Sequence, residues 1–262
     1  RQFRVPYGIE EHWTGYLPSD PLKPTSWQLA FSRRFIRDAA VVMPDSTDLG
    51  LAMQNLGLSG NYITVTNVVD TKLFKPQAKP AEKKYYRLLH ISTLHPVQKN
   101  FAGLLRALNC LNDIRNDFVL DVVSDGSYEP YRELARQLDL ADNIRFHGQL
   151  SSAEIAELAA KCDLLVMFSR YENFPCVIPE ALAAGLPVLS TRVGGIHEHV
   201  LPPLGKLVES EDEQAFAGAL DDMLHHLSNY DPQALHKYAD THFSYEAVGR
   251  QLLDIYERYI KP

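Results

Sequence analysis

The sequence predicts an α/β protein built around a doubly wound parallel sheet, and three observations support this fold class. From Tyr85 onward, short β-branched runs alternate with amphipathic stretches of helical period. Polar or glycine-containing loops follow these runs, at the ends where such sheets bind ligands. Hydrophobic residues make up 45% and charged residues 23% of the 262, the usual mixture for a globular protein with a packed core.

Five strands are expected in this sheet, each a short apolar run. They end at Ile91, Val123, His147, Phe168 and Ser190. Four helices are expected between them, in the segments FAGLLRALNCLNDI, EPYRELARQLDL, AEIAELAAK and ALAAG, and the third opens with a capping box from Ser151 to Glu154. Five strands alternating with four helices favour an open doubly wound sheet over a helical bundle or an all-β fold.

A smaller set of elements precedes Tyr85 and is too short to complete a domain alone. It contains a strand at Gly8–Glu11, a helix at about Trp27–Ala39, a strand at Ala40–Met43 and a helix after Ser46. The pattern is that of a second, partial Rossmann-like unit.

Composition divides the chain into three parts. The segment Lys75–Lys84 is rich in lysine and proline and has no large apolar residue, so it is expected to be an exposed linker. Beyond the last glycine loop, helices are expected at Asp212–Leu227, Gln233–Ala239 and Tyr245–Ile260. We therefore expect a first unit with a hinge at residues 1–78, a larger unit at 79–242 and a last helix at 243–262.

Charge and hydropathy exclude several classes of protein. The formal charge of -7 opposes nonspecific attraction to phosphate backbones, so no nucleic-acid partner is expected. No apolar run approaches the roughly 18 residues of a membrane span, and the start RQFRVPYGIEEHW lacks the apolar stretch of a signal peptide. Arg1 stands where a complete chain would begin with methionine, which suggests a processed product or an excised fragment.

The cysteines give no sign of a metal site or of disulfides. Cys110, Cys162 and Cys176 are an odd number, widely spaced, and form no paired arrangement with histidine of the kind that binds zinc. Three reduced thiols in a cytoplasmic protein are the expected state.

The loop between the fourth and fifth predicted strands carries the strongest chemical signal. Glu172 lies in the loop and Glu180 in the helix that follows, with seven residues between them. Because proline is tolerated only in the first turn of a helix, Pro179 predicts that this helix begins near Pro175 or Cys176.

Such a helix start would leave the amides of residues 176–178 without intrahelical partners, and free amides with the helix dipole bind anions. Glu180 points back toward the same end, where a carboxylate is favourable beside neutral donors such as sugar hydroxyls. A diphosphate joined to hydroxyls is a nucleotide sugar. Taken alone, Glu172 and Glu180 are equally well explained as a loop charge and a helix-start residue favoured by the dipole.

Three further loops contain glycine. The pair Gly194–Gly195 would let backbone amides approach a ligand closely, and Gly126 stands where a nucleotide would pass near the chain. Backbone groups for a base edge are expected at Gly148, Gln149 and Leu150. Simple turns explain these glycines as well.

Lys99 is predicted to lie at the start of the helix that follows the first strand. A cation there opposes the helix dipole, so a lysine makes more sense if a bound phosphate lies between them. Solvent exposure is the ordinary alternative for an isolated lysine.

Taken in order, these loops resemble those of glycosyltransferase family 4, whose members have the GT-B architecture of two facing Rossmann-like domains. The family's two-glutamate motif matches ENFPCVIPE, from Glu172 to Glu180, followed by ALAAGLPVLSTRVGGIHE. The segment TNVVDTKLFKP, from Thr66, is similar to the family's hinge. The segment that begins with SDGSYEP and ends with DLLVMFS is similar to the family's donor domain. The resemblance runs from about Glu11 to the last helix, and it implies that this helix packs back on the first domain.

The resemblance implies roles for the matching residues. Glu180 would bind the ribose hydroxyls, Glu172 would contact the transferred sugar near the reacting carbon, and Lys99 would bind phosphate. His12 would approach the sugar from the first domain, although a lone histidine is more often structural. The sugar and diphosphate would be held by the backbone around Asn173, Phe174, Pro175, Cys176, Gly194 and Gly195, with no amide hydrogen from Pro175.

The sequence departs from the family at two points. Where many members carry an arginine in Gly-Arg-Leu, this chain has Ser92-Thr93-Leu94, so Thr93 is expected at the ligand in place of a cation, and Arg170 is the candidate to replace the missing charge. Family members also carry further first-domain strands before the segment that starts at Arg1, so most of the acceptor site is expected outside this sequence.

The implied activity is transfer of a sugar from a nucleoside diphosphate sugar to a sugar or lipid-linked acceptor hydroxyl, with retained anomeric configuration and no metal or other cofactor. The family suggests envelope polysaccharide or lipopolysaccharide assembly in the cytoplasm, with peripheral contact at the inner membrane face. A noncatalytic nucleotide-sugar-binding module and a nucleotide-sugar epimerase on the same fold are the alternatives. The two-glutamate motif argues against the epimerase.

Overall fold

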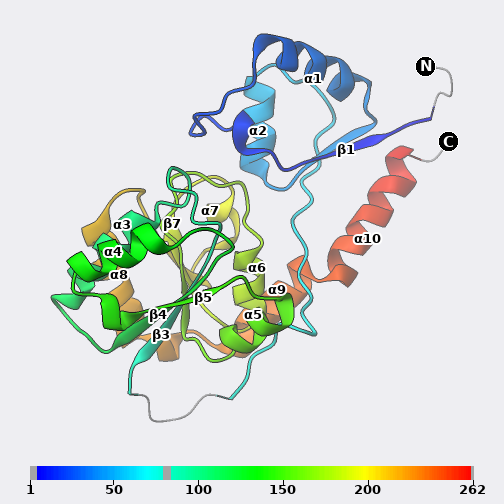
Figure 1. Cartoon of the computed structure of the whole chain (residues 1–262). Coiled ribbons are helices and arrows are strands. Elements are labelled where there is room, and N and C mark those ends of the chain that lie inside the picture. Colours follow the sequence, from blue (N-terminus) through cyan, green and yellow to red (C-terminus); the bar gives the residue numbers. More distant parts are fainter. Residues whose placement is uncertain (1–4, 79–83, 261–262) are drawn as a thin grey trace.

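A computed structural model describes residues 5–78 and 84–260, which form two parallel sheets (Figure 1). The smaller sheet pairs β1 (Gly8–Glu11) with β2 (Val41–Pro44). The larger sheet has six strands in the order β5-β4-β3-β6-β7-β8. Residues 79–83 of the expected linker 75–84, together with the expected boundary between the two units, lie outside the described residues.

The order of the large sheet confirms the predicted doubly wound fold. Its strands are β3 (Tyr86–Ile91), β4 (Phe118–Val123), β5 (Ile144–Gly148), β6 (Leu164–Val166), β7 (Val188–Thr191) and β8 (Gly205–Val208). The chain starts at β3, builds outward to β5, returns beside β3 with β6 and then builds the other way. The winding therefore reverses between β3 and β6, and such a switch point is where ligands bind in open α/β sheets.

Strand β8 corrects the prediction of five strands. Its four residues, Gly205–Val208, pair in parallel with β7 at one edge of the sheet. The segment GKLV contains a glycine and a lysine and follows two prolines closely, so it lacks the apolar run by which the other strands are recognised. Its pairing with β7, rather than its composition, makes it a strand.

Helices cover both faces of the large sheet (Figure 1). One face packs against α3 (Phe101–Asn112), α4 (Glu129–Gln137) and α8 (Glu213–His225). The other packs against α5 (Ser152–Ala159), α6 (Val177–Ala183) and α9 (Pro232–Phe243). Successive strand residues point to opposite faces, so Leu88 joins the first core and Leu89 the second.

The predicted capping box at the start of α5 is present. The side chain of Ser151 accepts a hydrogen bond from the amide of Glu154, and the Glu154 carboxylate accepts one from the amide of Ser151. The short 3-10 turns of the chain are η1 (Thr14–Tyr16), η2 (Ala141–Asn143) and η3 (Leu227–Asn229).

The smaller sheet is covered by α1 (Ser26–Asp38) and α2 (Thr47–Asn55), and on its other side by the end of the chain. Helix α10 (Tyr245–Ile255) leaves the large unit and packs on the first, with a final π-helical turn at Tyr256–Ile260 (Figure 1). Val248 and Ile255 of α10 share a core with Val41 and Met43 of β2. No helix in the described ranges is both long and apolar enough to span a lipid bilayer.

Candidate functional site

A cavity of about 620 Å³ lies where the carboxyl ends of β3 and β6 face the first unit. Both units contribute to its walls. The first supplies His12, Thr14, Asp45 and Asn67. The second supplies most of the remaining polar lining, at Ser92, Thr93, Lys99, Ser124, Asp125, Gln149, Glu172, Asn173 and Cys176, with Leu150, Phe174 and Pro175 among its apolar lining. The cavity is therefore open in the position that the sequence predicts for a ligand.

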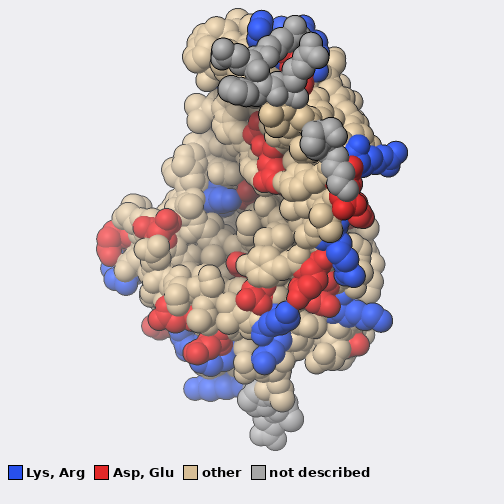
Figure 2. All heavy atoms as spheres, turned by 90° about the vertical axis from the view of Figure 1, so that its right-hand side faces the viewer, with Lys and Arg blue, Asp and Glu red and all other residues tan. Residues whose placement is uncertain are grey.

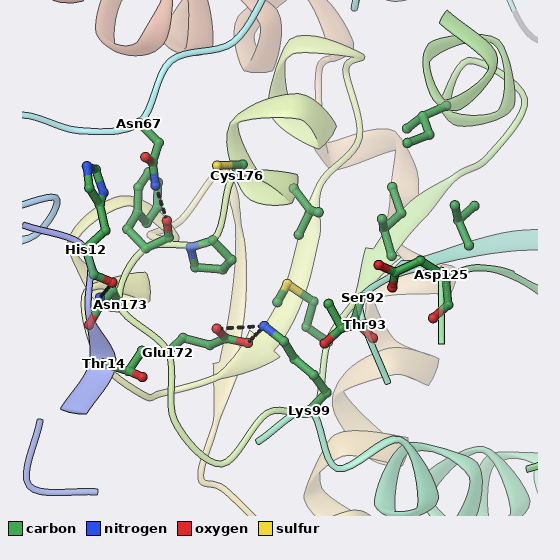
Figure 3. Close-up of a pocket in the computed structure, with 18 of the residues that line it drawn as sticks. His12, Thr14, Asn67, Ser92, Thr93, Lys99, Asp125, Glu172, Asn173 and Cys176 are labelled. Carbon is green, nitrogen blue, oxygen red and sulfur yellow. Dashed lines mark hydrogen bonds and ion pairs between the residues drawn. The ribbon is translucent and has the colours of Figure 1, made fainter. Parts of the chain in front are cut away.

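Lys99 and Glu172 form an ion pair in the middle of this cavity (Figure 3). The ammonium group lies 2.6 Å and 2.9 Å from the two carboxylate oxygens, and the side chains are only 14% and 4% exposed. Lys99 comes from the loop after β3 and Glu172 from the loop after β6, so the switch point brings them together. Both predicted site residues are thus neighbours in the structure.

The carboxylate of Glu172 has two further donors. The hydroxyl of Ser169 donates to it at 2.8 Å, and the side-chain nitrogen Nε2 of Gln98 donates to it at 3.2 Å. A buried charge is stable only when it is paired and hydrogen-bonded, and Glu172 meets both conditions. These contacts fix its position within the cavity.

His12 reaches the cavity from the first unit, as expected, because it follows the carboxyl end of β1. Its Nδ1 atom lies 3.6 Å from Oδ2 of Asp45, and the interaction with Asp45 raises the pKa of His12 above its ordinary value. The side-chain nitrogen of Asn173, Nδ2, donates to the backbone oxygen of His12 at 2.5 Å. The imidazole is therefore held at the boundary between the two units.

Helix α6 begins at Val177 with Cys176 as its N-cap, close to the predicted start. The predicted free amide at Ile178 is wrong, since this amide donates to the backbone oxygen of Pro175 at 3.1 Å. The first turn tightens into the three-residue spacing that helix starts often adopt. Fewer amides are therefore available at this end than the sequence suggested.

Glu180 lies in α6 close to Cys176, but it is not among the residues that line the cavity. It is half-buried, and its carboxylate makes no hydrogen bond or ion pair with the described residues. Burial raises its pKa to about 7. Burial and the nearby Glu180 in turn raise the pKa of the Cys176 thiol.

Replacing Glu180 by glutamine is expected to stabilise the fold more at high pH than at low pH. In the folded chain the pKa is raised from 4.5 to about 7, so the folded state binds the proton more tightly than the unfolded state. The free energy of unfolding of the wild type therefore falls as the pH rises from about 4.5 to about 7. At higher pH it stays at this lower value. We expect Glu180→Gln to add about 2 kcal/mol more at pH 8 than at pH 5.

Urea unfolding of the wild type and of Glu180→Gln at the two pH values measures this difference. Glu209→Gln, at a side chain that is 78% exposed, is the matched surface control. An effect of Glu180→Gln that is the same at pH 5 and pH 8 would show that Glu180 does not titrate between them.

The glycine pair serves the packing of the motif loop. A side chain at Gly194, where φ is +51°, would place its Cβ 1.6 Å from the backbone oxygen of Glu172. The Gly195 amide donates to the backbone oxygen of Asn173 at 2.9 Å, just before α7 (Ile196–His199). The expectation that the Gly195 amide serves a ligand is corrected, because that hydrogen is already used within the protein.

Arg170 does not supply the missing cation. Its guanidinium contacts Glu211 at 2.7 Å and donates to the backbone oxygens of Pro96 and Val97, each at 3.1 Å. It is not among the residues that line the cavity. Arg170 instead ties the loop after β6 to the loop after β3.

Two of the other predicted glycines stand beside the cavity rather than in its wall. Gly126 is required by close packing, since a Cβ there would lie 2.5 Å from the backbone oxygen of Thr93. Gly148 has a φ of +72° with open space around it, which is the simple left-handed turn. Their neighbours Asp125 and Gln149 line the cavity instead.

Sequence reasoning did not single out Asp45, Asn67 or Asp125, all of which line the cavity. Asp45 follows β2 directly, so the rule that strand ends carry ligand residues identifies it once it is applied to the first unit. Asp125 stands one residue before the predicted Gly126. Asn67 lies in the expected hinge and gives no such signal.

Hydrogen bonds across the cleft hold the units around the cavity. The Glu198 carboxylate accepts from the amides of Thr47 at 3.0 Å and Asp48 at 2.9 Å, at the start of α2. The side chain of Asn67 donates to the backbone oxygen of Phe174 at 2.6 Å. The structure therefore shows the two units in contact on either side of the site.

The lining of the cavity is more acidic than basic. Asp45, Asp125 and Glu172 contribute carboxylates, whereas Lys99 is the one lysine or arginine among the described lining residues. Figure 2 shows both acidic and basic side chains at the hollow between the upper and lower parts of the molecule. An anionic ligand therefore depends strongly on Lys99.

Residues 85–226 match the family described as glycosyl transferases group 1. A D-inositol 3-phosphate glycosyltransferase of Corynebacterium urealyticum is 35% identical over 129 residues, which are 47% of this chain and 30% of that protein. An MMP alpha-(1->4)-mannosyltransferase of Mycolicibacterium hassiacum is 28% identical over 204 residues, 73% of this chain and 47% of that protein. The chain thus spans less than half the length of either relative.

Solved structures show the same fold. Sucrose-phosphate synthase from Thermosynechococcus elongatus superimposes with a TM-score of 0.83 at 21% identity, over 98% of this chain and 68% of that one. The Anabaena protein HepE in complex with UDP gives a TM-score of 0.82 at 20% identity, over 97% of this chain and 72% of that one. These similarities confirm the GT-B fold expected from the sequence.

Proposed function

We propose, from the premise that the chain belongs to the group 1 glycosyl transferases, that it provides the donor side of an enzyme that moves a sugar from a nucleoside diphosphate sugar to an acceptor hydroxyl with retained configuration. The buried Lys99–Glu172 pair in the middle of a cavity shared by both units carries this proposal. Such a pair offers a cation to the diphosphate and a carboxylate to the sugar hydroxyls.

The cavity suggests the direction in which the donor lies. In Figure 3, His12 and Asn173 stand at one end, Lys99 and Glu172 in the middle, and Thr93 with its neighbours at the other. We assign the transferred sugar to the end shared with the first unit. The diphosphate then lies beside Lys99, and the nucleoside extends toward the loops after β4 and β5.

The main chemical task in this assignment is to stabilise the departing diphosphate. Lys99 does so by its charge, in a site whose low exposure makes a fixed cation more effective than in water. When Lys99 shares its charge with the diphosphate, Glu172 keeps the donors on Ser169 and Gln98. The leaving phosphate oxygen takes the proton of the acceptor hydroxyl, so this scheme needs no separate base.

The nucleotide-sugar donor is supported by structural neighbours. HepE has been solved in complex with UDP and in complex with UDP-glucose. Glu180 is proposed to bind the ribose hydroxyls, which would give its unpartnered carboxylate the donors that it lacks. Independence of metal ions, a cytoplasmic location with peripheral membrane contact and a role in envelope polysaccharide assembly belong to the same proposal.

Titration calorimetry of the chain with UDP, GDP, UDP-glucose and GDP-mannose tests it. We expect at least one of these to bind with a Kd below about 1 mM, which corresponds to roughly 4 kcal/mol of binding free energy. Absence of binding by all four would contradict the proposal. Binding without transfer to any acceptor would indicate a noncatalytic module, and isomer formation without an acceptor would indicate an epimerase.

Cys176 offers an independent readout of ligand position. Its side chain is exposed and lines the cavity, whereas Cys110 lies outside it and Cys162 is buried. Because the pKa of Cys176 is raised, iodoacetamide is applied at pH 8.5, and saturating UDP-glucose is expected to slow modification of Cys176 but not of Cys110. Mass spectrometry of the peptides measures both rates, and an unchanged Cys176 rate would speak against a ligand at the start of α6.

A further inference from the structure

Among the described residues, three buried side-chain oxygens have no hydrogen-bond partner: Oδ1 of Asp45, Oδ1 of Asn173 and Oγ of Ser190. The first two belong to residues that line the cavity. A buried acceptor without a donor is destabilising, and a charged one is more so. Each unpaired buried group in a native structure therefore calls for an explanation, and a functional role is one of them.

The two unpaired oxygens belong to side chains that both contact His12. Asp45 is 3% exposed, and its other oxygen, Oδ2, faces His12 Nδ1 at 3.6 Å. Asn173 is 5% exposed, and its nitrogen donates to the His12 backbone oxygen at 2.5 Å. Each side chain thus uses one polar atom on His12 and leaves its second without a donor.

Asp45 is held in place by its position in the fold. It follows the last residue of β2, its amide donates to the backbone oxygen of Glu11 at 3.3 Å, and the next residue caps α2. Across the cleft, a Cβ at Gly195 would lie 2.3 Å from the Cβ of Ser46. The two acceptors therefore come from different units, and the closeness of those units fixes their arrangement.

The chemistry of these atoms restricts what binds there. A carboxylate oxygen and an amide oxygen only accept hydrogen bonds, so a phosphate group, which offers acceptors, does not satisfy them. Hydroxyl groups do, and they form short charge-assisted bonds with a carboxylate. A cationic ligand is less suited, because the other oxygen of Asp45 already faces His12 Nδ1 at 3.6 Å, and this interaction favours the protonated imidazole.

We propose that Asp45 and Asn173 form a subsite for the hydroxyl groups of a sugar, and that Asp45 determines which sugar hydroxyls are accepted. This inference rests on the proposed function. The transferred sugar and a sugar acceptor both offer such hydroxyls, and His12, Asp45 and Asn173 all line the cavity. The test separates the two sources.

Calorimetry compares the wild type with Asp45→Asn, which keeps the shape of the side chain but removes its charge. The probes are UDP, GDP, UDP-glucose and GDP-mannose. We expect Asp45→Asn to leave the Kd of the nucleoside diphosphate within about twofold and to weaken the matching nucleotide sugar at least tenfold, the effect of about 1.4 kcal/mol of lost hydrogen bonding. Asp38→Asn, the same change at the end of α1 and outside the cavity, is the matched control.

A second titration adds free glucose or mannose to the chain saturated with UDP or GDP. Loss of this binding in Asp45→Asn, with nucleotide-sugar affinity unchanged, would assign the subsite to the acceptor and support the proposal. Wild-type affinities for all probes in Asp45→Asn would overturn it. Retained binding of the nucleoside diphosphate shows that the variant is folded, and failure of the wild type to bind any probe would contradict the proposed function itself.

Discussion

Replacing Lys99 by methionine is expected to destabilise the folded chain by about 3 kcal/mol, because it leaves the carboxylate of Glu172 buried without its counter-ion. Glu172 is 4% exposed and keeps only the donors on Ser169 and Gln98. In the proposed function the same change removes the cation beside the diphosphate. We therefore also expect at least a tenfold loss of affinity for the nucleotide, and of turnover in an active preparation.

Urea unfolding and calorimetry measure these two effects. The double variant Lys99→Met with Glu172→Gln is expected to recover most of the stability, since no buried charge remains, but not the nucleotide affinity. Lys72→Met removes the lysine of an exposed pair whose side chains are 81% and 57% exposed, and it should leave stability unchanged. Near-normal stability and binding in Lys99→Met would contradict both the burial argument and the assignment.

Replacing Gly194 by alanine is expected to destabilise the fold by more than about 3 kcal/mol. The new Cβ would lie 1.6 Å from the backbone oxygen of Glu172 and 3.1 Å from that of Asn173, at a φ of +51°. Both neighbours are backbone atoms of the motif loop, so the clash is relieved only by moving the loop that positions Glu172. We expect the remaining folded protein to bind nucleotide sugars poorly.

Gly218→Ala is the matched control for this change. Gly218 lies inside α8, and a Cβ there meets nothing within 4 Å. Alanine at an open helical position is expected to stabilise by about 0.5–1 kcal/mol. Urea unfolding of both variants gives the comparison, and a Gly194→Ala protein as stable as the wild type would show that the motif loop relaxes freely.

Most of the large sheet is predictable, because most of its elements can be recognised from their own local sequence. Successive residues such as Leu88 and Leu89 are both apolar, which is the pattern of a strand covered on two faces. The start of α5 is recognised from Ser151 and Glu154 alone. By contrast, β8 is a strand because it pairs with β7. The composition of Gly205–Val208 does not predict this pairing with a distant segment.

The site is predictable as a set of loops but not as a set of contacts. Strand ends bring Lys99 and Glu172 to one edge of the sheet, yet their ion pair joins residues 73 positions apart and emerges only from the fold. Arg170 is a free cation in the sequence and a partner of Glu211 in the structure. Asp45 follows β2 and so satisfies the strand-end rule, but its burial and its unpaired oxygen are seen only in the structure.

The Glu198 carboxylate completes the start of a helix that belongs to the opposite unit. Within its own unit, α2 has only the Ser46 hydroxyl, which serves the amide of Leu49 and leaves those of Thr47 and Asp48 to Glu198. Parting the units would therefore leave these two amides to water, expose the positive end of the α2 dipole and weaken the first turn. Contact between the units and order at the start of α2 are thus coupled, and whatever stabilises one of them favours the other.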